Sequence, residues 1–195
     1  MSSYTTFTLN ELLERKGDAF VRAAISGFSC KHNTEVDAFL QEGAVVSSRL
    51  KSSVSYLVFE NGTGLCVGYF TLAIKPLSLP AVLFSATERK RLERFSRLDG
   101  SGEVYNVAAY LIAQIGRNRN DEQEATISGR ALMELAKSEI RVAQGRVGGQ
   151  VVFLEKEQGN AFLEKFYASC GFRTFGSRDA QEDGVTYDQM FSFLK

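Results

Sequence analysis

The spacing of hydrophobic residues divides the first part of the chain into helices. Thr8 and Glu11 in "TLNELLER" have the spacing of a capping box, which predicts a helix beginning after Thr8. The stretch "DAFVRAAISGF" predicts another short helix that ends near Gly27. A third helix is predicted from Thr34 to about Ser48, because apolar residues recur there at helical spacing. Its buried face comprises Val36, Phe39, Leu40 and Ala44.

The pattern then changes to that of β-strands. The runs "VSYLVFE" and "LCVGYFTLAIK" are rich in β-branched and aromatic residues. The Asn61-Gly62 pair between them favours a tight turn, so the two runs are predicted to form an antiparallel hairpin. Pro76 and Pro80 bracket the next segment, "PLSLP", which we expect to be a connecting loop or a hinge.

A short basic surface helix is predicted in "SATERKRLERFSRLDG". Ser85 and Glu88 have capping-box spacing at its start, Leu92 and Phe95 share one face, and Gly100 ends it. Its basic residues are Arg89, Lys90, Arg91, Arg94 and Arg97. These could contact a phosphate backbone, but glutamates dilute the patch, and a solvated helix face is the commoner cause of such a pattern.

A nearly continuous apolar run, "EVYNVAAYLIAQI", predicts a strand buried on both faces in the middle of a sheet. A helix is predicted from about Ser128 to Gly145, and "QVVFLE" after it predicts another buried strand. Because a strand, a helix and a further strand normally make a right-handed crossover, the two strands are expected to be parallel. The apolar stripe of the helix comprises Ala131, Leu132, Leu135, Ala136 and Ile140.

The C-terminal part adds one helix and two strands. "NAFLEKFYASCGF", from Asn160 to Phe172, predicts an amphipathic helix closed by glycine, and "FRTF" and "VTYDQMFSFLK" predict the strands. The stripe of this helix comprises Phe162, Leu163, Phe166, Tyr167 and Cys170. The expected fold class is a mixed α/β, mostly antiparallel sheet with one central parallel strand pair and helices on both faces. Residues 1–195 are expected to form one domain.

Composition narrows the classes of function. Twenty-three basic residues balance twenty-three acidic ones, so net charge does not favour nucleic acid or an anionic membrane as a partner. No apolar run approaches the ~20 residues that span a bilayer, and no basic leader precedes an apolar segment, so we expect a cytoplasmic protein. The widely spaced Cys30, Cys66 and Cys170 indicate small buried residues, and His32 is the single histidine. We therefore expect no metal site.

The loop "EATISGR" is a candidate phosphate site because it joins the core strand to a helix start. The N–H groups of a first helical turn, together with the helix dipole, favour an anion such as a pyrophosphate. Thr126 or Ser128 in a plain helix cap would produce the same pattern. The loop alone leaves both explanations open.

The order of these elements resembles the GNAT superfamily of N-acetyltransferases over most of the chain. "ISGRALMELA" is similar to the family's Q/R-x-x-G-x-G/A loop and following helix, and "NAFLEKFYASCGF" is similar to its N-x-x-A-x-x-x-Y-x-x-x-GF stretch. "GFSCKHNTEVDAFLQEGA" and "YLVFENGTGLCVGYFTLAIK" resemble the branch with prophage-linked and toxin-like members. The loop departs from the family pattern, since Glu124 stands at the usual Gln/Arg and Ile127 at the usual first glycine.

The resemblance implies acetyl-coenzyme A (acetyl-CoA) as co-substrate. By this resemblance Tyr167 protonates the departing thiolate, and Asn160 helps hold the pantetheine arm. A phenol with a pKa near ~10 suits protonation of a thiolate whose pKa is near ~8.5, although a packed core tyrosine remains the alternative. The implied cofactor-binding residues are Ile115, Ala125, Thr126, Ile127, Ser128, Gly129, Arg130 and Asn160.

The predicted function is transfer of an acetyl group from acetyl-CoA to a primary amine, without a covalent enzyme intermediate. Glu103 and Glu155 lie at strand ends, but each is expected to be a solvated carboxylate, so neither is assigned as general base. Two alternatives remain: a toxin-type acetyltransferase acting on aminoacyl-tRNA, and a non-catalytic acyl-CoA-binding module. The acceptor amine, any antitoxin partner and the oligomeric state, including a homodimer, are left open.

Overall fold

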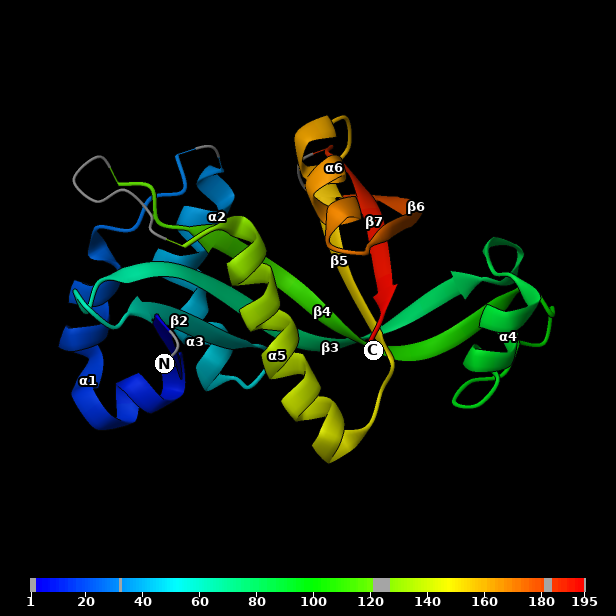
Figure 1. The fold of residues 1–195 in the computed structure, drawn as a ribbon, viewed down its shortest axis with the longest axis horizontal. Coiled ribbons are helices and arrows are strands. Elements are labelled where there is room, and N and C mark those ends of the chain that lie inside the picture. The colour runs from blue at the N-terminus through cyan, green and yellow to red at the C-terminus, as the bar shows by residue number, and fades with distance from the viewer. Residues whose placement is uncertain (1–2, 32, 121–126, 181–183, 195) are drawn as a thin grey trace. The chain divides into compact units, whose positions relative to one another are not determined.

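The computed structural model describes residues 3–31, 33–120, 127–180 and 184–194 (Figure 1). The chain contains strands, α-helices, a π-helical segment (η1) and a 3-10 segment (η2). In order, the elements are β1 Tyr4–Thr8, α1 Leu9–Ser26, α2 Thr34–Ala38, η1 Phe39–Gly43, α3 Ala44–Arg49, β2 Val54–Glu60, β3 Cys66–Pro80, η2 Ala81–Leu83, α4 Ala86–Leu92, β4 Val104–Arg117, α5 Gly129–Val147, β5 Val151–Glu157, α6 Ala161–Ser169, β6 Arg173–Asp179 and β7 Thr186–Phe193.

The strands form one seven-stranded sheet with the hydrogen-bonded order β1-β2-β3-β4-β5-β7-β6. β1 with β2, β2 with β3, β5 with β7 and β6 with β7 are antiparallel pairs. β4 and β5 are parallel, with Tyr110 opposite Val152 and Leu111 opposite Phe153. α5 connects these two strands along the chain, as a parallel pair requires. The predicted mixed sheet with a central parallel pair is confirmed.

The chain folds into two compact units. The first comprises Met1–Ala73 and Ile112–Ile140, and the second comprises Ile74–Leu111 and Arg141–Lys195. Three elements, β3, β4 and α5, supply residues to both units.

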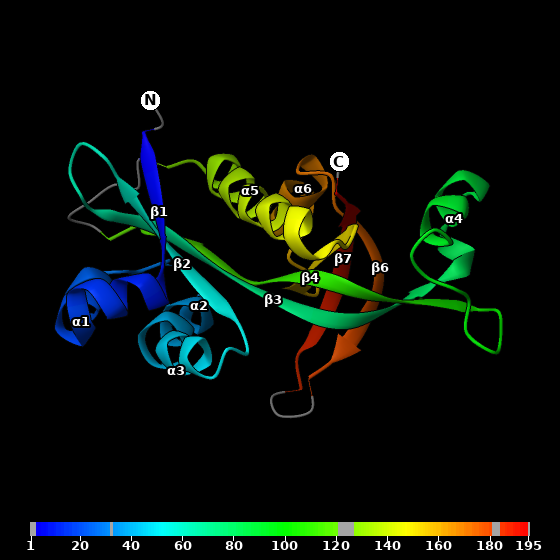
Figure 2. The ribbon, with the colours of Figure 1, turned by 90° about the horizontal axis from the view of Figure 1, so that it is seen from below.

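In the first unit, helices cover both faces of the strands. α1, α2 and α3 lie together on one side of β2 and β3 (Figure 2), where Tyr69 Oη donates a hydrogen bond of 2.6 Å to the Val36 carbonyl. Adjacent strand residues face opposite sides, so Gly68 faces away from α2, and a Cβ at Gly68 would lie 3.2 Å from Leu132 of α5. The core beneath α1–α3 comprises Leu9, Leu12, Val21, Ile25, Phe28, Val36, Leu40, Ala44, Leu57, Cys66 and Tyr69.

Local signals in the first unit are confirmed. The Thr8 side chain accepts from the Glu11 N–H and the Glu11 carboxylate accepts from the Thr8 N–H, which completes the predicted capping box. Gly17, with φ of +81°, breaks α1 into the two predicted helices. The next helix begins at Thr34, as predicted, and Asn33 caps it, because its Oδ1 accepts from two backbone N–H groups. The hairpin at Asn61-Gly62 forms between β2 and β3.

In the second unit, the two faces of β5 pack against different elements. Val151 and Phe153 contribute to a core with η2, α4 and adjoining parts of β3, β4, β6 and β7. Its buried members are Leu77, Leu79, Ala81, Phe84, Leu92, Tyr105, Val107, Ala109, Val151, Phe153, Phe175 and Phe191. Lys156 is on the opposite face of β5 and forms an ion pair with Glu164 of α6, so α6 covers that face.

Three predicted features of the second unit are wrong. "PLSLP" is no loop, because β3 continues to Pro80 and buried Leu77 and Leu79 alternate with exposed neighbours, as in a strand with one covered face. α4 ends at Leu92, well before Gly100, and Phe95 is exposed rather than on its buried face. β4 is not covered on both faces throughout, since exposed residues alternate with buried ones along its first half.

Candidate functional site

The start of α5 is formed by Ser128 and Gly129, as predicted. Ser128 Oγ accepts a hydrogen bond of 3.1 Å from the Ala131 N–H, and the Ser128 carbonyl accepts from the Leu132 N–H. Ser128 is therefore a helix N-cap, which was the structural alternative for this residue. The first-turn N–H groups of an α-helix have no acceptor within the helix, so the same turn retains the chemistry of an anion site.

Arg117, which the sequence analysis missed, lies beside this turn. Its Nη1 donates a hydrogen bond of 3.2 Å to the carbonyl of Ile127, which is fully buried. Burial lowers the pKa of Arg117, and nearby Arg119 lowers it further, although a guanidinium remains charged at neutral pH. A fixed cation therefore adjoins the helix start. In the sequence, the indication of this role was that Arg117 is the last residue of the core strand before the loop.

The other predicted residues near this turn are placed as follows. Ile115 is a half-buried residue of β4, two positions before Arg117. Arg130 is exposed in the first turn of α5. Ala125 and Thr126 lie outside the described residues, as does Glu124. The structure thus describes only residues 127 to 130 of the candidate phosphate site.

Asn160 lies at the start of α6 and Tyr167 lies within it, both in the second unit. Asn160 is the N-cap of α6, because its Oδ1 accepts a hydrogen bond of 3.0 Å from the Leu163 N–H. No partner of its Nδ2 is found among the described residues. The amide thus has a structural role through its oxygen, and its two N–H donors can serve a ligand carbonyl.

Tyr167 is the buried residue of α6, with 7% of its surface exposed. Its ring lies 5.3 Å from the ring of Phe166 and 6.3 Å from that of Phe172. The predicted apolar stripe is only partly covered, because Cys170 is buried while Phe162 is 75% exposed. The prediction that Phe162 shares a buried stripe with Tyr167 is therefore wrong.

The two acidic residues considered as general bases differ in environment. Glu155 accepts hydrogen bonds from Arg178 (2.6–2.8 Å) and from Gln189 (2.8 Å). Burial raises its pKa, but these hydrogen bonds outweigh burial and leave the pKa lowered. Glu103 is exposed. A carboxylate whose charge is stabilised in this way is a weak base, so Glu155 remains unassigned.

The described cysteines do not have the environment of a nucleophile. Burial raises the pKa of Cys30 and of Cys66 to about 11, so both thiols are protonated at neutral pH. Cys66 and Cys170 are buried, as predicted, and Cys30 is half-buried. His32 lies outside the described residues. Within the described ranges, no group of three or more His, Cys, Asp or Glu is arranged to hold a metal ion.

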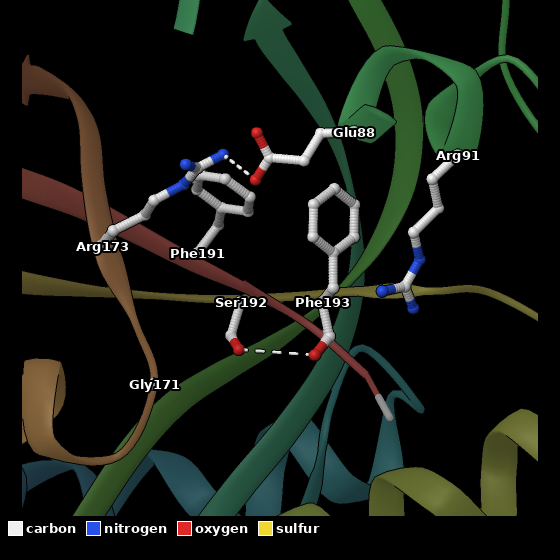
Figure 3. Close-up of a pocket in the computed structure, with 7 residues that line it drawn as sticks. All are labelled: Glu88, Arg91, Gly171, Arg173, Phe191, Ser192 and Phe193. Carbon is white, nitrogen blue, oxygen red and sulfur yellow. Dashed lines mark hydrogen bonds and ion pairs between the residues drawn. The ribbon is translucent and has the colours of Figure 1, made fainter. Parts of the chain in front are cut away.

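A pocket of about 270 Å³ in the second unit is lined by other residues, namely Glu88, Arg91, Gly171, Arg173, Phe191, Ser192 and Phe193 (Figure 3). Arg173 forms an ion pair of 2.8 Å with Glu88 and lies over the Phe191 ring. Arg91 donates to Gln150 and lies over the Phe193 ring. Arg91 thus connects α4 to Gln150 and β7, and Arg173 connects β6 to α4 and β7. None of the predicted site residues lines this pocket.

Comparison with known proteins gives matches only among solved structures. No protein-family model matches the sequence, and no curated protein matches it. The chain aligns with "AtaT complexed with acetyl-methionyl-tRNAfMet" at a TM-score of 0.64 and 19% identity, over 94% of this chain and 93% of that one. It aligns with a tyrosine-to-phenylalanine mutant of KacT at a TM-score of 0.62 and 16% identity, over 95% of this chain and 94% of that one. With "AtaTR bound with AcCoA" the TM-score is 0.59 and the identity 20%, over 96% of this chain and 94% of that one.

These alignments cover nearly the whole of each chain, so the fold is shared. The predicted GNAT-like fold is therefore confirmed, and its structural neighbours include bacterial toxins. No helix among the described residues combines the length and apolar character needed to cross a membrane.

Proposed function

We propose that the chain is an acetyl-CoA-dependent N-acetyltransferase that moves the acetyl group directly to a primary amine. The observation that carries this proposal is the shared fold with AtaT over 94% of the chain. The start of α5 and the Asn160–Tyr167 segment support it, because both carry the groups that such a reaction needs. We also propose a cytoplasmic location, where acetyl-CoA is available.

The turn from Ile127 to Arg130 is proposed to bind the phosphates of acetyl-CoA. Its first-turn N–H groups and the dipole of the 19-residue helix α5 favour an anion. Arg117 holds the Ile127 carbonyl and adds positive charge beside the turn. Backbone donation tolerates the non-glycine residue at position 127, because the donors are N–H groups rather than side chains.

Tyr167 is proposed to act on the reacting end of the co-substrate. Acetyl-CoA supplies an activated acetyl thioester, and a neutral amine attacks its carbonyl carbon. The departing sulfur carries negative charge as the carbon–sulfur bond breaks, and the Tyr167 hydroxyl donates a proton to it. The nitrogen of the new amide loses one proton, which restores the Tyr167 phenol directly or through water. The Asn160 amide is proposed to hold the pantetheine arm, with its oxygen engaged in the helix cap and its N–H donors facing the ligand.

A second candidate specifies the acceptor as the amino group of an aminoacyl-tRNA. The observation that favours it is the structure of AtaT complexed with acetyl-methionyl-tRNAfMet. The basic helix contributes less to this candidate than its composition indicates, because Arg89 donates to the Phe84 carbonyl and Arg91 to Gln150. Lys90, Arg94 and Arg97 are exposed.

One experiment separates these candidates from a non-catalytic acyl-CoA-binding module. Acetyl-CoA is titrated by calorimetry, and free thiol is then measured with a panel of small amines and charged tRNAs. Binding with thiol release only for charged tRNA supports the toxin-type acceptor. Release with small amines supports the general acetyltransferase. Binding without release under every condition contradicts catalysis and leaves the binding module.

A further inference from the structure

Lys156 is a buried cation close to the proposed catalytic helix. It is on β5 in the second unit, and its side chain has 0% exposure. Removing an ammonium group from water is strongly unfavourable unless other charges and hydrogen bonds compensate for the lost hydration. The charged partners of Lys156 therefore compensate for the burial of its ammonium group.

Those partners are on two further elements. Lys156 Nζ lies 2.6 Å from Asp188 Oδ2 on β7, and these residues are opposite each other in the antiparallel pair. Nζ also lies 3.9 Å from Glu164 Oε2, near the start of α6. The hydrogen bond from Lys156 lowers the pKa of Asp188, which favours its charged form. Lys156 thus connects β5, β7 and α6 through one charge.

The contact on α6 falls between the two proposed functional residues. Glu164 follows the cap residue Asn160 by four positions and precedes Tyr167 by three, so Glu164 and Tyr167 are neighbours on the helix surface. Figure 1 shows α6 beside β5 and β7. A helix of nine residues is not stable by itself, so its order depends on contacts with the rest of the unit.

Apolar residues at both positions 156 and 188 would be an adequate structural alternative to the ion pair. Replacing a buried ion pair by hydrophobic groups of similar volume is often neutral or stabilising for the fold. Asp188 is 17% exposed and also accepts from Gln158, so it would keep a partner and water without the lysine. Stability alone is therefore a weak reason for a lysine here, whereas a cation at this position can also pair with Glu164 of α6.

We propose that Lys156 is a positioning residue that holds the first turn of α6, and with it Asn160 and Tyr167, in the orientation required for acetyl transfer. The proposed effect on transfer rests on the function proposed above. The effect on the order of α6 does not, and it is measured without any ligand.

The main variant is Lys156→Met, which keeps an unbranched apolar side chain and removes the charge. In the ligand-free protein, amide hydrogen exchange from Leu163 to Tyr167 is expected to become about tenfold faster, because local opening of α6 becomes easier. The melting temperature is expected to fall, because the variant removes one partner of a buried ion pair and leaves the Asp188 carboxylate without its 2.6 Å hydrogen bond, so α6 exchange is compared with exchange of the β5 amides in the same variant. The turnover number is expected to fall about tenfold, with the KM for acetyl-CoA changed less than about threefold.

Glu155→Gln is the matched control. Glu155 is the adjacent residue on β5 and forms an ion pair of 2.6 Å with Arg178 of β6, on the face that α6 does not cover. This variant is expected to leave exchange in α6 unchanged. Glu164→Gln is the second variant, and since Glu164 is 56% exposed its loss does not threaten folding. It is expected to accelerate α6 exchange about threefold.

The outcomes distinguish this proposal from the proposed function. Unchanged α6 exchange in both Lys156→Met and Glu164→Gln would overturn the positioning role, whatever the activity. Faster α6 exchange with an unchanged turnover number would also overturn it. If the wild-type chain transfers no acetyl group, the proposed function fails, and the exchange data still decide whether Lys156 orders α6.

Discussion

Tyr167 is packed between the rings of Phe166 and Phe172, which suits both a core residue and a proton donor. Tyr167→Phe separates the two, because it removes the hydroxyl and keeps the ring. A proton donor should lose about 10²–10⁴-fold in turnover number with acetyl-CoA affinity nearly unchanged. A core tyrosine should lose about 0.5–1.5 kcal/mol of stability and little activity. Thiol-release kinetics, calorimetry and thermal unfolding measure the three quantities.

Tyr69→Phe is the control for that experiment. Tyr69 is fully buried, and its hydroxyl donates to the Val36 carbonyl at 2.6 Å. Its loss should lower stability by roughly the same amount and leave the turnover number within about twofold. If Tyr167→Phe and Tyr69→Phe behave alike in activity, Tyr167 is a structural residue.

Cys30 tests the absence of a covalent intermediate. Burial raises its pKa to about 11, so its thiol is protonated at neutral pH and is a poor nucleophile. Cys30→Ala should therefore leave the turnover number within about threefold of wild type. Loss of transfer in a folded Cys30→Ala variant, or an acetylated cysteine trapped by mass spectrometry, would replace direct transfer by a two-step mechanism.

At the scale of elements, the start of α5 is the structure proposed to bind the phosphates of the co-substrate. Gly129→Glu places a negative charge in its first turn, which interacts favourably with the helix dipole and should stabilise the fold by about 0.3–1 kcal/mol. The same charge repels phosphate, so acetyl-CoA affinity should fall at least about tenfold. A variant that is at least as stable as wild type and binds far more weakly, by calorimetry, is the expected result.

Gly145→Glu introduces the same substitution near the other end of α5. Gly145 is exposed, and no atom lies within 4 Å of a Cβ built there. A negative charge near a helix C-terminus is mildly unfavourable, by about 0.3–1 kcal/mol, and should not affect acetyl-CoA affinity. Equal losses of affinity in both variants would remove the helix start from the binding site.

The elements that could be predicted from sequence are those specified by neighbouring residues. The capping boxes at Thr8 and Ser85 each depend on a glutamate three positions later, and the β2–β3 hairpin depends on Asn61-Gly62. "PLSLP" was misassigned because proline favours loops locally. Leu77 and Leu79 are buried in a core formed with residues far away in the sequence, and this burial favours the strand. Local signals do not report such long-range packing.

The same distinction applies to the candidate site. Ser128 could be found because a helix cap has a local pattern, whereas Asn160 was identified by its resemblance to the family's N-x-x-A stretch; both are caps in the structure. Arg117 could have been suspected from its position at the end of the core strand, but its hydrogen bond to Ile127 could not be predicted, and Lys156 could not be assigned because its partners come from other segments of the chain. Lys156 in particular pairs with Asp188, 32 residues away, and nothing near it in sequence indicates that it is buried.

At the scale of the whole molecule, we propose that the two units unfold as one domain, because β3, β4 and α5 run through both. Phe191→Ala removes a ring that is almost fully buried in the second unit, at an expected cost of about 3–5 kcal/mol. Amides in both units should then exchange faster together, since a cooperative domain has one global opening. Phe162→Ala, at a 75% exposed site, should change little. Faster exchange confined to the second unit would indicate two domains.

The central claim is acetyl transfer from acetyl-CoA to an amine, and a single-turnover assay tests it most directly. Acetyl-CoA labelled in the acetyl group is mixed with excess wild-type protein and a panel of amines that includes charged tRNA. Free thiol and acetylated amine are measured together. We predict that both appear at the same rate with at least one acceptor, and about 10²–10⁴-fold more slowly with Tyr167→Phe. Bound acetyl-CoA that yields no acetylated amine with any acceptor would contradict the account.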